Sequence, residues 1–374
     1  MRLEAVELFR LDVAFRRPVV TASGTHRERP VAFLRILTDA GEGWGECPAI
    51  AGGTAVDRPF EAVWDALAST GVERLRAAAA ARGGAVPPAA QVGTLYGAAD
   101  DAPVAATVEM AVLDAELRAR GEPLWRRLGV EPSVAEAGLP VGSLVGIPAD
   151  RGLDTLVDAV AAASATSARV RLKIEPGWDV EPAWVVRRAF PTLALQVDAN
   201  GSYRLGSGGP DDVRLLAGLD GAGLTCIEQP LPPADLTALA AAAAVLETPV
   251  CLDESLTSLR RLRDALRYGA CEVACIKPAR FGGVLGAARA QQLCADAEVP
   301  AFVGGFFETG FARLANAALA GLPGFTLPGD LSDPAGYLED APVAYPSDGG
   351  RVAPYAGPGI GPPPRLGPPA RRWT

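Results

Sequence analysis

Five charged side chains each end an apolar, strand-like run of the sequence, in the order Lys, Asp, Glu, Asp, Lys. They are Lys173, Asp198, Glu228, Asp253 and Lys277. If these runs are neighbouring parallel strands, their carboxyl ends meet at one edge with a spacing of about 4.8 Å, so three carboxylates reach one cation. Oxygen ligands without His or Cys favour Mg²⁺, or Mn²⁺, over zinc. One such residue is usually a helix cap or a solvated ion pair, but five in uninterrupted order favour a site.

The chemistry that suits this set is removal of a proton next to a carboxylate. The resulting enediolate dianion needs strong positive stabilisation, which a bound metal supplies. A lysine acts as a base near neutral pH when neighbouring cations lower its pKa, and Arg171 and the metal are candidates for that effect. The sequence has one histidine, His26, far from these runs, so a triad that uses histidine inside this region is excluded.

A repeat of strand and helix must position these residues. We expect strands at 140–145, 169–174, 193–198, 224–228, 249–253, 272–277 and 300–303, and helices at 151–163, 180–190, 211–218, 234–246, 257–268, 283–297 and 309–320. A repeat of about 25 to 30 residues is typical of one βα unit. A weaker run at 325–327 indicates an incomplete last unit, so the sequence predicts a (β/α)7β-type TIM-like barrel of the α/β class. An open doubly wound sheet is the alternative, but its Gly-rich turn after the first strand is missing.

The residues before the barrel do not follow the strand–helix repeat. We expect two or three strands before residue 46 and helices at 60–69, 73–81 and 104–120. We therefore expect an N-terminal α+β capping domain at 1–130, a catalytic barrel at 131–330, and a segment rich in Pro and Gly at 331–374 that returns to the capping domain. Loops near 21–29 and 48–54 are expected to cover the barrel mouth and to select the substrate.

The composition limits the partners. The net charge of −9 and the isoelectric point near 4.9 argue against nucleic acid or an anionic membrane as the main partner. The N-terminus lacks the apolar core of a signal peptide, and we expect a cytoplasmic protein that acts on a small-molecule carboxylate. The six cysteines are scattered, as is typical of reduced core thiols, and Cys271 and Cys275 lack the second pair that a cysteine metal site would need.

The five residues and their surroundings resemble the enolase superfamily, muconate lactonising subgroup. The similarity rests on the runs Arg171-Leu172-Lys173, Asp198-Ala199-Asn200, Glu228-Gln229-Pro230, Asp253-Glu254-Ser255 and Ile276-Lys277-Pro278. The segments 173–179, 304–310 and 322–330 are similar to the branch of o-succinylbenzoate synthases and N-succinylamino acid racemases. The resemblance implies that Asp198, Glu228 and Asp253 bind Mg²⁺, and that Lys173 and Lys277 face opposite sides of the substrate α-carbon. It also implies a homo-oligomer.

Further positions bear on the reaction and the substrate. The family usually has Lys-x-Lys where this chain has Arg171 and Lys173, and Arg cannot exchange protons as Lys does. Arg280, three residues after Lys277, is typical of the branch members that racemise. Ser143, Asn200, Gly305 and Glu308 are candidates for substrate contact, and Glu254 for a supporting role, as are Arg171 and Arg280.

Three functions remain open at this point. The first is a Mg²⁺-dependent o-succinylbenzoate synthase of menaquinone biosynthesis that dehydrates a succinyl-hydroxycyclohexadiene carboxylate, with or without racemase activity. The second is an N-acylamino acid racemase, or a cycloisomerase or epimerase of the same subgroup. The third is a barrel without catalytic activity that serves as a binding protein, which the complete set of lysines and carboxylates disfavours.

Overall fold

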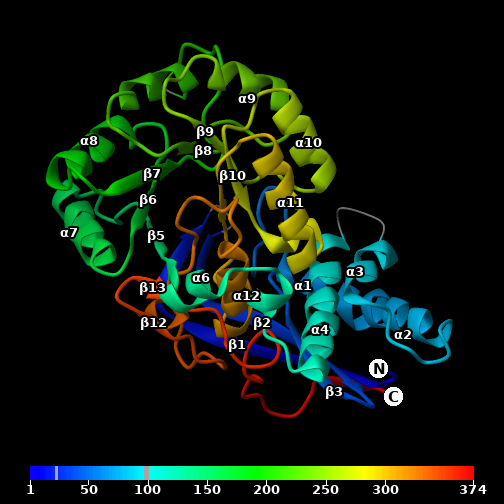
Figure 1. The fold of residues 1–374 in the computed structure, drawn as a ribbon. Coiled ribbons are helices and arrows are strands. Elements are labelled where there is room, and N and C mark those ends of the chain that lie inside the picture. Colours follow the sequence, from blue (N-terminus) through cyan, green and yellow to red (C-terminus); the bar gives the residue numbers. More distant parts are fainter. Residues whose placement is uncertain (22–23, 97–100, 210) are drawn as a thin grey trace.

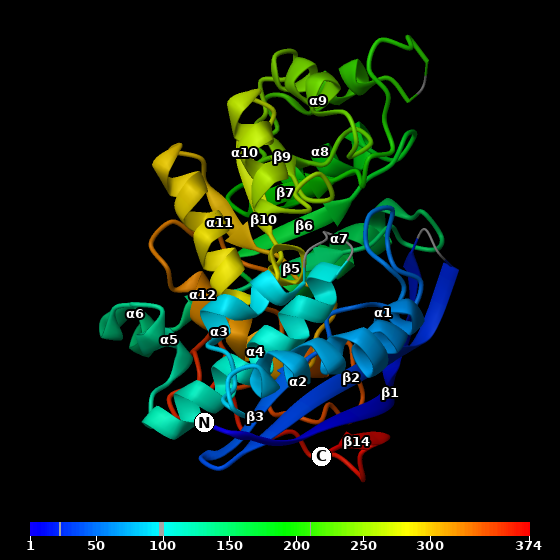
Figure 2. The same cartoon turned by 90° about the vertical axis from the view of Figure 1, so that its right-hand side faces the viewer.

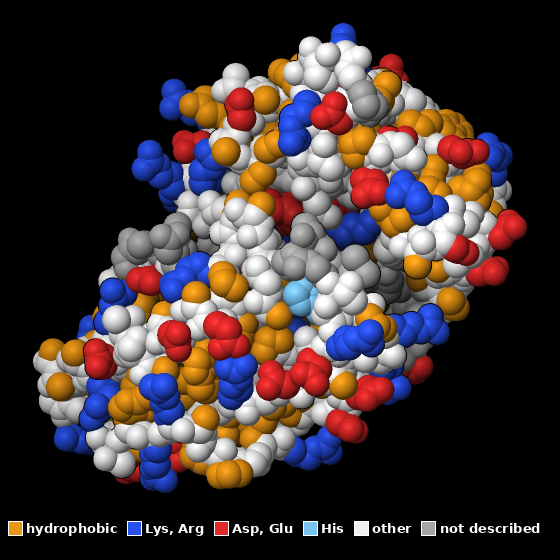
Figure 3. Space-filling view, turned by 180° about the vertical axis from the view of Figure 1, so that it is seen from behind, with side chains coloured by type: hydrophobic (Ala, Val, Ile, Leu, Met, Phe, Trp, Pro, Cys, Tyr) orange, Lys and Arg blue, Asp and Glu red, His pale blue; other side chains and the backbone are white. Residues whose placement is uncertain are grey.

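The computed structural model describes residues 1–21, 24–96, 101–209 and 211–374. Two lobes are visible, a curled parallel sheet surrounded by helices and an antiparallel sheet covered by helices (Figures 1 and 2). The surface is hollowed between the lobes, and acidic and basic side chains are visible inside the hollow (Figure 3).

The smaller lobe, called the cap below, is built on an antiparallel sheet with the strand order β14-β1-β2-β3. Its strands are β1 (Leu3–Thr21), β2 (Gly24–Thr38), β3 (Gly41–Glu46) and β14 (Arg371–Trp373). The C-terminal strand β14 pairs with β1, so the end of the chain returns to the cap. The segment 21–29 is not the predicted loop. Residues 22–23 lie outside the described residues. Residues 24–29 are part of β2 and pair with β1 across 13–21, because the hairpin of β1 and β2 extends past the part of the sheet that β3 joins.

The helices of the cap pack on one face of this sheet. They are α1 (Phe60–Ala66), the π-helix η1 (Leu67–Gly71), α2 (Val72–Ala80), α3 (Ala89–Val92), the 3₁₀-helix η2 (Gly93–Leu95) and α4 (Ala102–Arg120). Helix α4 lies directly on β3 because Gly43 and Gly45 have no side chains. A Cβ on Gly43 would lie 2.2 Å from Ala111 O, and one on Gly45 would lie 2.1 Å from Thr107 O. The close approach requires glycine at both positions.

The larger lobe is the predicted barrel, and among the described residues its sheet has seven parallel strands in sequential order. The strands are β5 (Gly142–Val145), β6 (Arg169–Lys173), β7 (Ala194–Asp198), β8 (Ile227–Glu228), β9 (Val250–Leu252), β10 (Val273–Ile276) and β11 (Ala301–Val303). The helices are α7 (Leu153–Ser164), α8 (Val180–Ala189), α9 (Leu236–Ala243), α10 (Leu259–Arg267), α11 (Val284–Asp296) and α12 (Gly310–Ala320). The helix predicted at 211–218 is instead the 3₁₀-helix η4 (Val213–Leu219).

The last barrel unit is irregular, as predicted. Single parallel bridges join Ala301 to Phe325 and Val141 to Gly329, so the segment 325–330 connects the two edge strands, β11 and β5. The remaining short elements are α5 (Leu124–Arg127), α6 (Pro132–Ala137), β4 (Leu139–Pro140), η5 (Pro278–Phe281), η6 (Pro334–Gly336), β12 (Ser347–Asp348) and β13 (Arg351–Val352).

Two buried carboxylates of the cap complete the N-termini of barrel helices. Glu46, at the end of β3, accepts hydrogen bonds from the backbone nitrogens of Thr309 and Ala312 at the start of α12. Glu109 of α4 accepts from the backbone nitrogens of Val284 and Leu285 at the start of α11. Neither helix has a side-chain cap at its own N-cap residue. Since the first N–H groups of a helix have no partner inside it, the cap supplies acceptors that the barrel sequence lacks.

Candidate active site

The carboxyl ends of β6, β7 and β8 carry Lys173, Asp198 and Glu228 in one row. The parallel ladders pair Lys173 with Asp198, and Asp198 with Glu228. Asp253 directly follows β9 and Lys277 directly follows β10, so both stand at the same edge of the sheet. The structure therefore brings the five predicted residues to one end of the barrel.

Lys173 is held by two residues at the end of β7. Its ammonium donates to Asp198 Oδ2 at 2.6 Å and to Asn200 Oδ1. Asn200 has a φ of +44°, and its side-chain nitrogen donates to Glu254 Oε1 at 2.8 Å. A left-handed backbone is uncommon for a residue other than glycine and persists where the surrounding contacts fix it. Asn200 thus joins Lys173 to Glu254, and its contact with the substrate stays a prediction.

Lys277 is packed between a carboxylate and an aromatic ring. Its Nζ lies 2.8 Å from Asp253 Oδ2 and 4.5 Å from the centroid of the Phe306 ring. A Cβ on Gly304 would lie 2.9 Å from Lys277 Cγ, so the absence of a side chain there leaves room for the lysine. Burial has the largest single effect and would lower the pKa of Lys277, but Asp253, together with Cys275 and Glu254, raises that pKa above its ordinary value. The contact favours the ammonium form.

Lys173 and Lys277 are the only lysines in the sequence, so 33 of its 35 basic residues are arginines. Arginine serves every other cationic position, including Arg171, where the family resemblance led us to expect lysine. A guanidinium remains charged in proteins, whereas an amine can give and take a proton. The lysines are therefore placed where proton transfer is expected.

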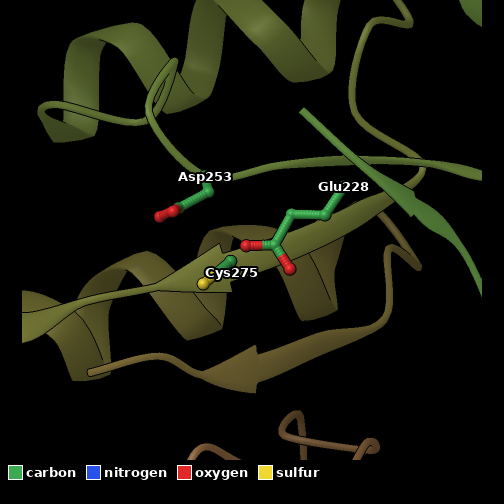
Figure 4. Close-up of side chains that lie close together, drawn as sticks. All are labelled: Glu228, Asp253 and Cys275. Atoms are coloured by element: carbon green, nitrogen blue, oxygen red, sulfur yellow. The ribbon is translucent and has the colours of Figure 1, made fainter. Parts of the chain in front are cut away.

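Two of the predicted metal ligands lie close to a thiol. The ligand atoms of Glu228, Asp253 and Cys275 all lie within 4.8 Å of one another, and the three side chains are buried (Figure 4). In the described part of the chain, Asp198 is outside this group and is held by Lys173. Burial raises the pKa of Glu228 to about 8, in spite of Arg171 and with the help of the Asp198 and Asp253 carboxylates. Lys277 and Arg280 have the opposite effect on Asp253, whose pKa they hold below its ordinary value against the effect of burial.

The donor set fits a hard divalent cation. Two buried carboxylates that repel each other, with a third in the next strand, form a group that a positive charge would stabilise. Asp198, Glu228 and Asp253 would hold Mg²⁺ through oxygen atoms, as expected from the sequence. This ligand assignment stays a prediction.

Arg171 binds the middle carboxylate of the row. Its Nη1 donates to both oxygens of Glu228 at 2.8 Å, and its Nη2 donates to Asp330 Oδ2 at 2.7 Å. Asp330 also accepts from Arg169 Nη2 at 2.7 Å. Asp330 is the last residue of the irregular segment 325–330 that closes the barrel, so its ion pairs join this segment to Arg169 and Arg171 of β6. The sequence does not indicate this role of Asp330, although the residue ends the segment 322–330 on which the family resemblance partly rests.

Arg280 connects the site with the cap. Its Nη1 donates to Asp253 Oδ1 at 2.7 Å, and its Nε and Nη2 donate to the two carboxylate oxygens of Asp57 at 2.9 and 2.7 Å. Asp57 belongs to the loop after β3, near the predicted specificity loop 48–54. A cavity of about 150 Å³ lies here, lined by Pro48, Ala49, Ile50, Val56, Asp57, Arg58, Ala102, Pro103, Thr257, Ala279, Arg280 and Phe306. Since Phe306 also contacts Lys277, one wall of this cavity borders the lysine.

Gln229, which sequence reasoning also missed, shapes the turn that carries Asp253. Its side-chain oxygen accepts from the backbone nitrogens of Asp253 and Ser255, both at 3.1 Å, and its own φ is +40°. The motif Glu228-Gln229-Pro230 marked the position, but nothing in the sequence shows that Gln229 reaches the neighbouring strand end. The signal for Cys275 was similarly weak, because its partners lie on other strands.

Ser143 is not brought to the site. The ladder pairs Ser143 with Val170, and Leu144 with Arg171. Since paired residues on neighbouring strands share a face, Ser143 lies on the face opposite to Arg171, and its hydroxyl hydrogen-bonds to Ser167 Oγ. Gly142 and Leu144 are the residues of β5 on the inner face, and Leu144 is 36% exposed.

Gly305 and Glu308 lie in the loop after β11, which a hydrogen bond and an ion pair of Glu308 hold in place. Glu308 Oε1 accepts from the backbone nitrogen of Phe306 at 2.8 Å, and its Oε2 lies 3.3 Å from Arg313 Nε. A Cβ on Gly305 would lie 2.7 Å from Glu308 Oε2, so this packing requires the glycine. Contact of either residue with substrate stays a prediction.

Comparison with known proteins agrees with this geometry. Residues 5–129 match the family model of the mandelate racemase / muconate lactonizing enzyme N-terminal domain, and residues 154–365 match the enolase C-terminal domain-like model. An N-succinylamino acid racemase of Amycolatopsis sp is 40% identical over 364 residues, covering 96% of this chain and 95% of that protein. An o-succinylbenzoate synthase of Bacillus subtilis (strain 168) is 30% identical over 365 residues, covering 96% and 94%.

The solved structures include a probable mandelate racemase from Alicyclobacillus acidocaldarius, with a TM-score of 0.86, 34% identity, and coverage of 96% of this chain and 92% of that one. No helix within the described residues has the length and apolar character needed to cross a membrane. The resemblance expected from the sequence is confirmed. On its fold, its strand-end residues and these matches, the chain belongs to the enolase superfamily, in the family of mandelate racemase and muconate lactonizing enzyme.

Proposed function

We propose that this protein is a Mg²⁺-dependent o-succinylbenzoate synthase that dehydrates a succinyl-hydroxycyclohexadiene carboxylate in menaquinone biosynthesis, and that it also racemises N-succinylamino acids. The observation that carries the proposal is the placement of the only two lysines, Lys173 and Lys277, at the ends of β6 and β10 with the predicted metal ligands between them. Relatives with both names support the choice of substrate class.

In the dehydration, Lys173 in its amine form takes the proton from the carbon next to the substrate carboxylate. It then gives a proton to the departing hydroxyl group, which leaves as water when the carbon–oxygen bond breaks. The Lys277 ammonium stabilises the negative charge that develops on the substrate. When bound, Mg²⁺ supplies further positive charge to the same carboxylate.

In the racemisation, one lysine removes the α-proton and the other delivers a proton to the opposite face. The supporting observations are the 40% identical relative named as an N-succinylamino acid racemase, and Arg280, which contacts the partner of Lys277. Because Lys173 pairs with Asp198 and Lys277 with Asp253, each lysine has a carboxylate that can hold its ammonium form.

The cap is proposed to select the tail of the substrate. The cavity of about 150 Å³ has mainly apolar walls from residues 48–50, 56, 102–103 and 279, and it borders Phe306 beside Lys277. A short acyl group or an apolar side chain has a suitable size for this space.

The test uses the purified protein after treatment with a chelator. It is assayed with and without added Mg²⁺ against the cyclohexadiene carboxylate, and against N-succinylamino acids in deuterium oxide. The proposal expects dehydration and incorporation of α-deuterium, both dependent on Mg²⁺ and both lost in Lys173→Ala. Dehydration without deuterium incorporation would reject the racemase, and deuterium incorporation without dehydration would reject the synthase. Absence of both reactions in the folded protein would reject the whole proposal.

A further inference from the structure

Cys275 lies beside the two carboxylates that form the core of the predicted Mg²⁺ site. The register that pairs Ala274 with Leu252 places Cys275 next to Asp253 on the inner face of the barrel. The ligand atoms of Cys275, Asp253 and Glu228 lie within 4.8 Å of one another, and Figure 4 shows the three side chains close together, with Asp253 on the loop that follows β9.

The thiol of Cys275 has no hydrogen bond within the described part of the chain, and it packs in a buried cluster with Cys226, Cys251, Val273 and Phe302. By contrast, the Cys251 and Cys271 thiols contact the backbone oxygens of Leu252 and Val273. Cys275 is also 1% exposed, so no solvent replaces the missing partner. Since a buried cysteine commonly packs as a small apolar side chain, the observation that points to a ligand is the approach of its sulfur to the two carboxylates.

The donor types select the kind of cation. Thiolate sulfur favours soft and borderline cations, whereas Mg²⁺ takes oxygen ligands. Two carboxylate oxygens and one thiolate are a set that Zn²⁺ and Cd²⁺ accept, with a water molecule or a further side chain completing the coordination. Glu228 Oε2 accepts from both Arg171 and Gln196, so it has no free lone pair. Glu228 Oε1 and the two oxygens of Asp253 each accept one hydrogen bond, from Arg171, Arg280 and Lys277, and keep a second lone pair for a cation.

We propose that Glu228, Asp253 and Cys275 form a second metal site that binds a thiophilic divalent cation such as Zn²⁺ or Cd²⁺, and that this binding excludes Mg²⁺. The S–H bond of Cys275 breaks, its proton passes to solvent, and a sulfur–metal bond forms. The exclusion follows because both cations need Glu228 and Asp253. Binding of the soft cation stands on the geometry alone, whereas its effect on turnover rests on the proposed function.

The test measures cation binding by absorbance, without substrate. Chelator-treated protein is titrated with Cd²⁺, and the thiolate-to-cadmium charge-transfer band in the ultraviolet is recorded. The expected result is a band that saturates at one Cd²⁺ per chain, and that needs more Cd²⁺ when excess Mg²⁺ is present. In Cys275→Ser the band should be lost, with Cd²⁺ affinity lower by about tenfold or more. Cys294→Ser, which removes a buried thiol of α11, is the matched control and should retain the band.

Two results would overturn the proposal: no band in the parent protein, or an unchanged band in folded Cys275→Ser. If Cys275→Ser does not fold, Asp253→Asn in the same titration takes its place, and an undiminished Cd²⁺ affinity there is equally decisive. Inhibition of the dehydration reaction by Cd²⁺ is measured in a separate experiment. If the protein dehydrates its substrate, Cd²⁺ should inhibit the parent about tenfold more strongly than Cys275→Ser, and Mg²⁺ should relieve the inhibition. A protein that binds Cd²⁺ through Cys275 but has no such activity would reject only the proposed function.

Discussion

Arg171 donates through a single nitrogen, Nη1, to both carboxylate oxygens of Glu228, each at 2.8 Å. Its other terminal nitrogen reaches Asp330, so one guanidinium joins a predicted metal ligand to the segment that closes the barrel. A lysine, with one ammonium on a flexible chain, cannot reproduce this forked contact.

We expect Arg171→Met to destabilise the protein by about 3–5 kcal/mol, because Glu228 and Asp330 would lose a buried cationic partner. Mg²⁺ should restore more stability to this variant than to the parent, since the cation then replaces the lost charge on Glu228. Urea unfolding with chelator and with Mg²⁺ measures both effects. Equal stabilisation of parent and variant by Mg²⁺ would contradict the placement of the cation on Glu228.

Amine-selective acylation should inactivate the enzyme through Lys173. The sequence has two lysines, and the Lys173 side chain is 27% exposed while that of Lys277 is 9% exposed. Mass spectrometry can follow both lysines and the N-terminal amine during inactivation. Loss of activity should run parallel with modification of Lys173, and substrate with Mg²⁺ should slow it. Full activity after complete modification of Lys173 would exclude this residue as the base.

Gly304→Ala should reduce turnover while the fold remains intact. The added Cβ would lie 2.5 Å from Cys275 Sγ and 2.9 Å from Lys277 Cγ, so the lysine must move. A displacement of about 1 Å in a reacting group can lower the rate by about a hundredfold. Gly336→Ala is the matched control, because a Cβ there meets nothing within 4 Å. Circular dichroism checks that both variants are folded, and steady-state kinetics measures their kcat values. Equal kcat values would show that the added Cβ does not displace Lys277 from its reactive position.

Asp57→Asn should raise KM more than it lowers kcat. Asp57 holds Arg280 with two hydrogen bonds and forms part of the wall of the cavity that we assign to the substrate tail. Loss of one buried charge-assisted contact costs about 1.5–3 kcal/mol, which corresponds to about a tenfold to a hundredfold effect. Glu61→Gln breaks an exposed ion pair with Arg10 in the same lobe and should leave KM unchanged. A KM in Asp57→Asn as low as in this control would disprove the assignment of the cavity.

The stability of the protein should depend on the protonation of Glu109. Burial raises the pKa of this carboxyl group from 4.5 to about 7, against the hydrogen bonds from Leu285 and Val284. Because the pKa is higher in the folded state, this contribution to stability is complete below about pH 4.5 and is lost as the pH rises towards 7. The free energy of unfolding of the parent, relative to Glu109→Gln, should fall by up to about 3 kcal/mol across that window.

Denaturant unfolding at several pH values between 4.5 and 8 measures this difference. Glu73→Gln, which neutralises an exposed carboxylate of α2, is the control and should follow the parent. If the parent and Glu109→Gln keep a constant difference at all pH values, Glu109 does not titrate in this range.

The regular part of the barrel was predictable from the sequence because each unit repeats a local pattern. An apolar run that ends in a charge marked the ends of β6 to β10 within one or two residues, and parallel strands necessarily bring those ends together. The irregular last unit was also predictable, because the run at 325–327 is short and weakly apolar.

The structure differs from the prediction where the position of a residue depends on a partner far away in the sequence. The run that contains Ser143 does not alternate, so the sequence does not show which side of β5 faces inward, and the paired register with β6 decides it. The residues after Gly24 are polar, which favours a loop, yet they form part of β2 because β1 supplies the partner strand. The roles of Arg171, Asp330 and Cys275 arise only when three strands meet.

The carboxylates of Glu46 and Glu109 reach across to α12 and α11 and complete the ends of helices that belong to the other lobe. The two lobes are therefore not interchangeable modules. A chimera that joins this barrel to the cap of a relative would leave backbone N–H groups of two helices without acceptors unless the new cap has carboxylates at both places. Recombination between relatives is thus constrained at two residues of the cap that bind barrel helices, and a designer who wishes to exchange specificity loops should graft the loops alone.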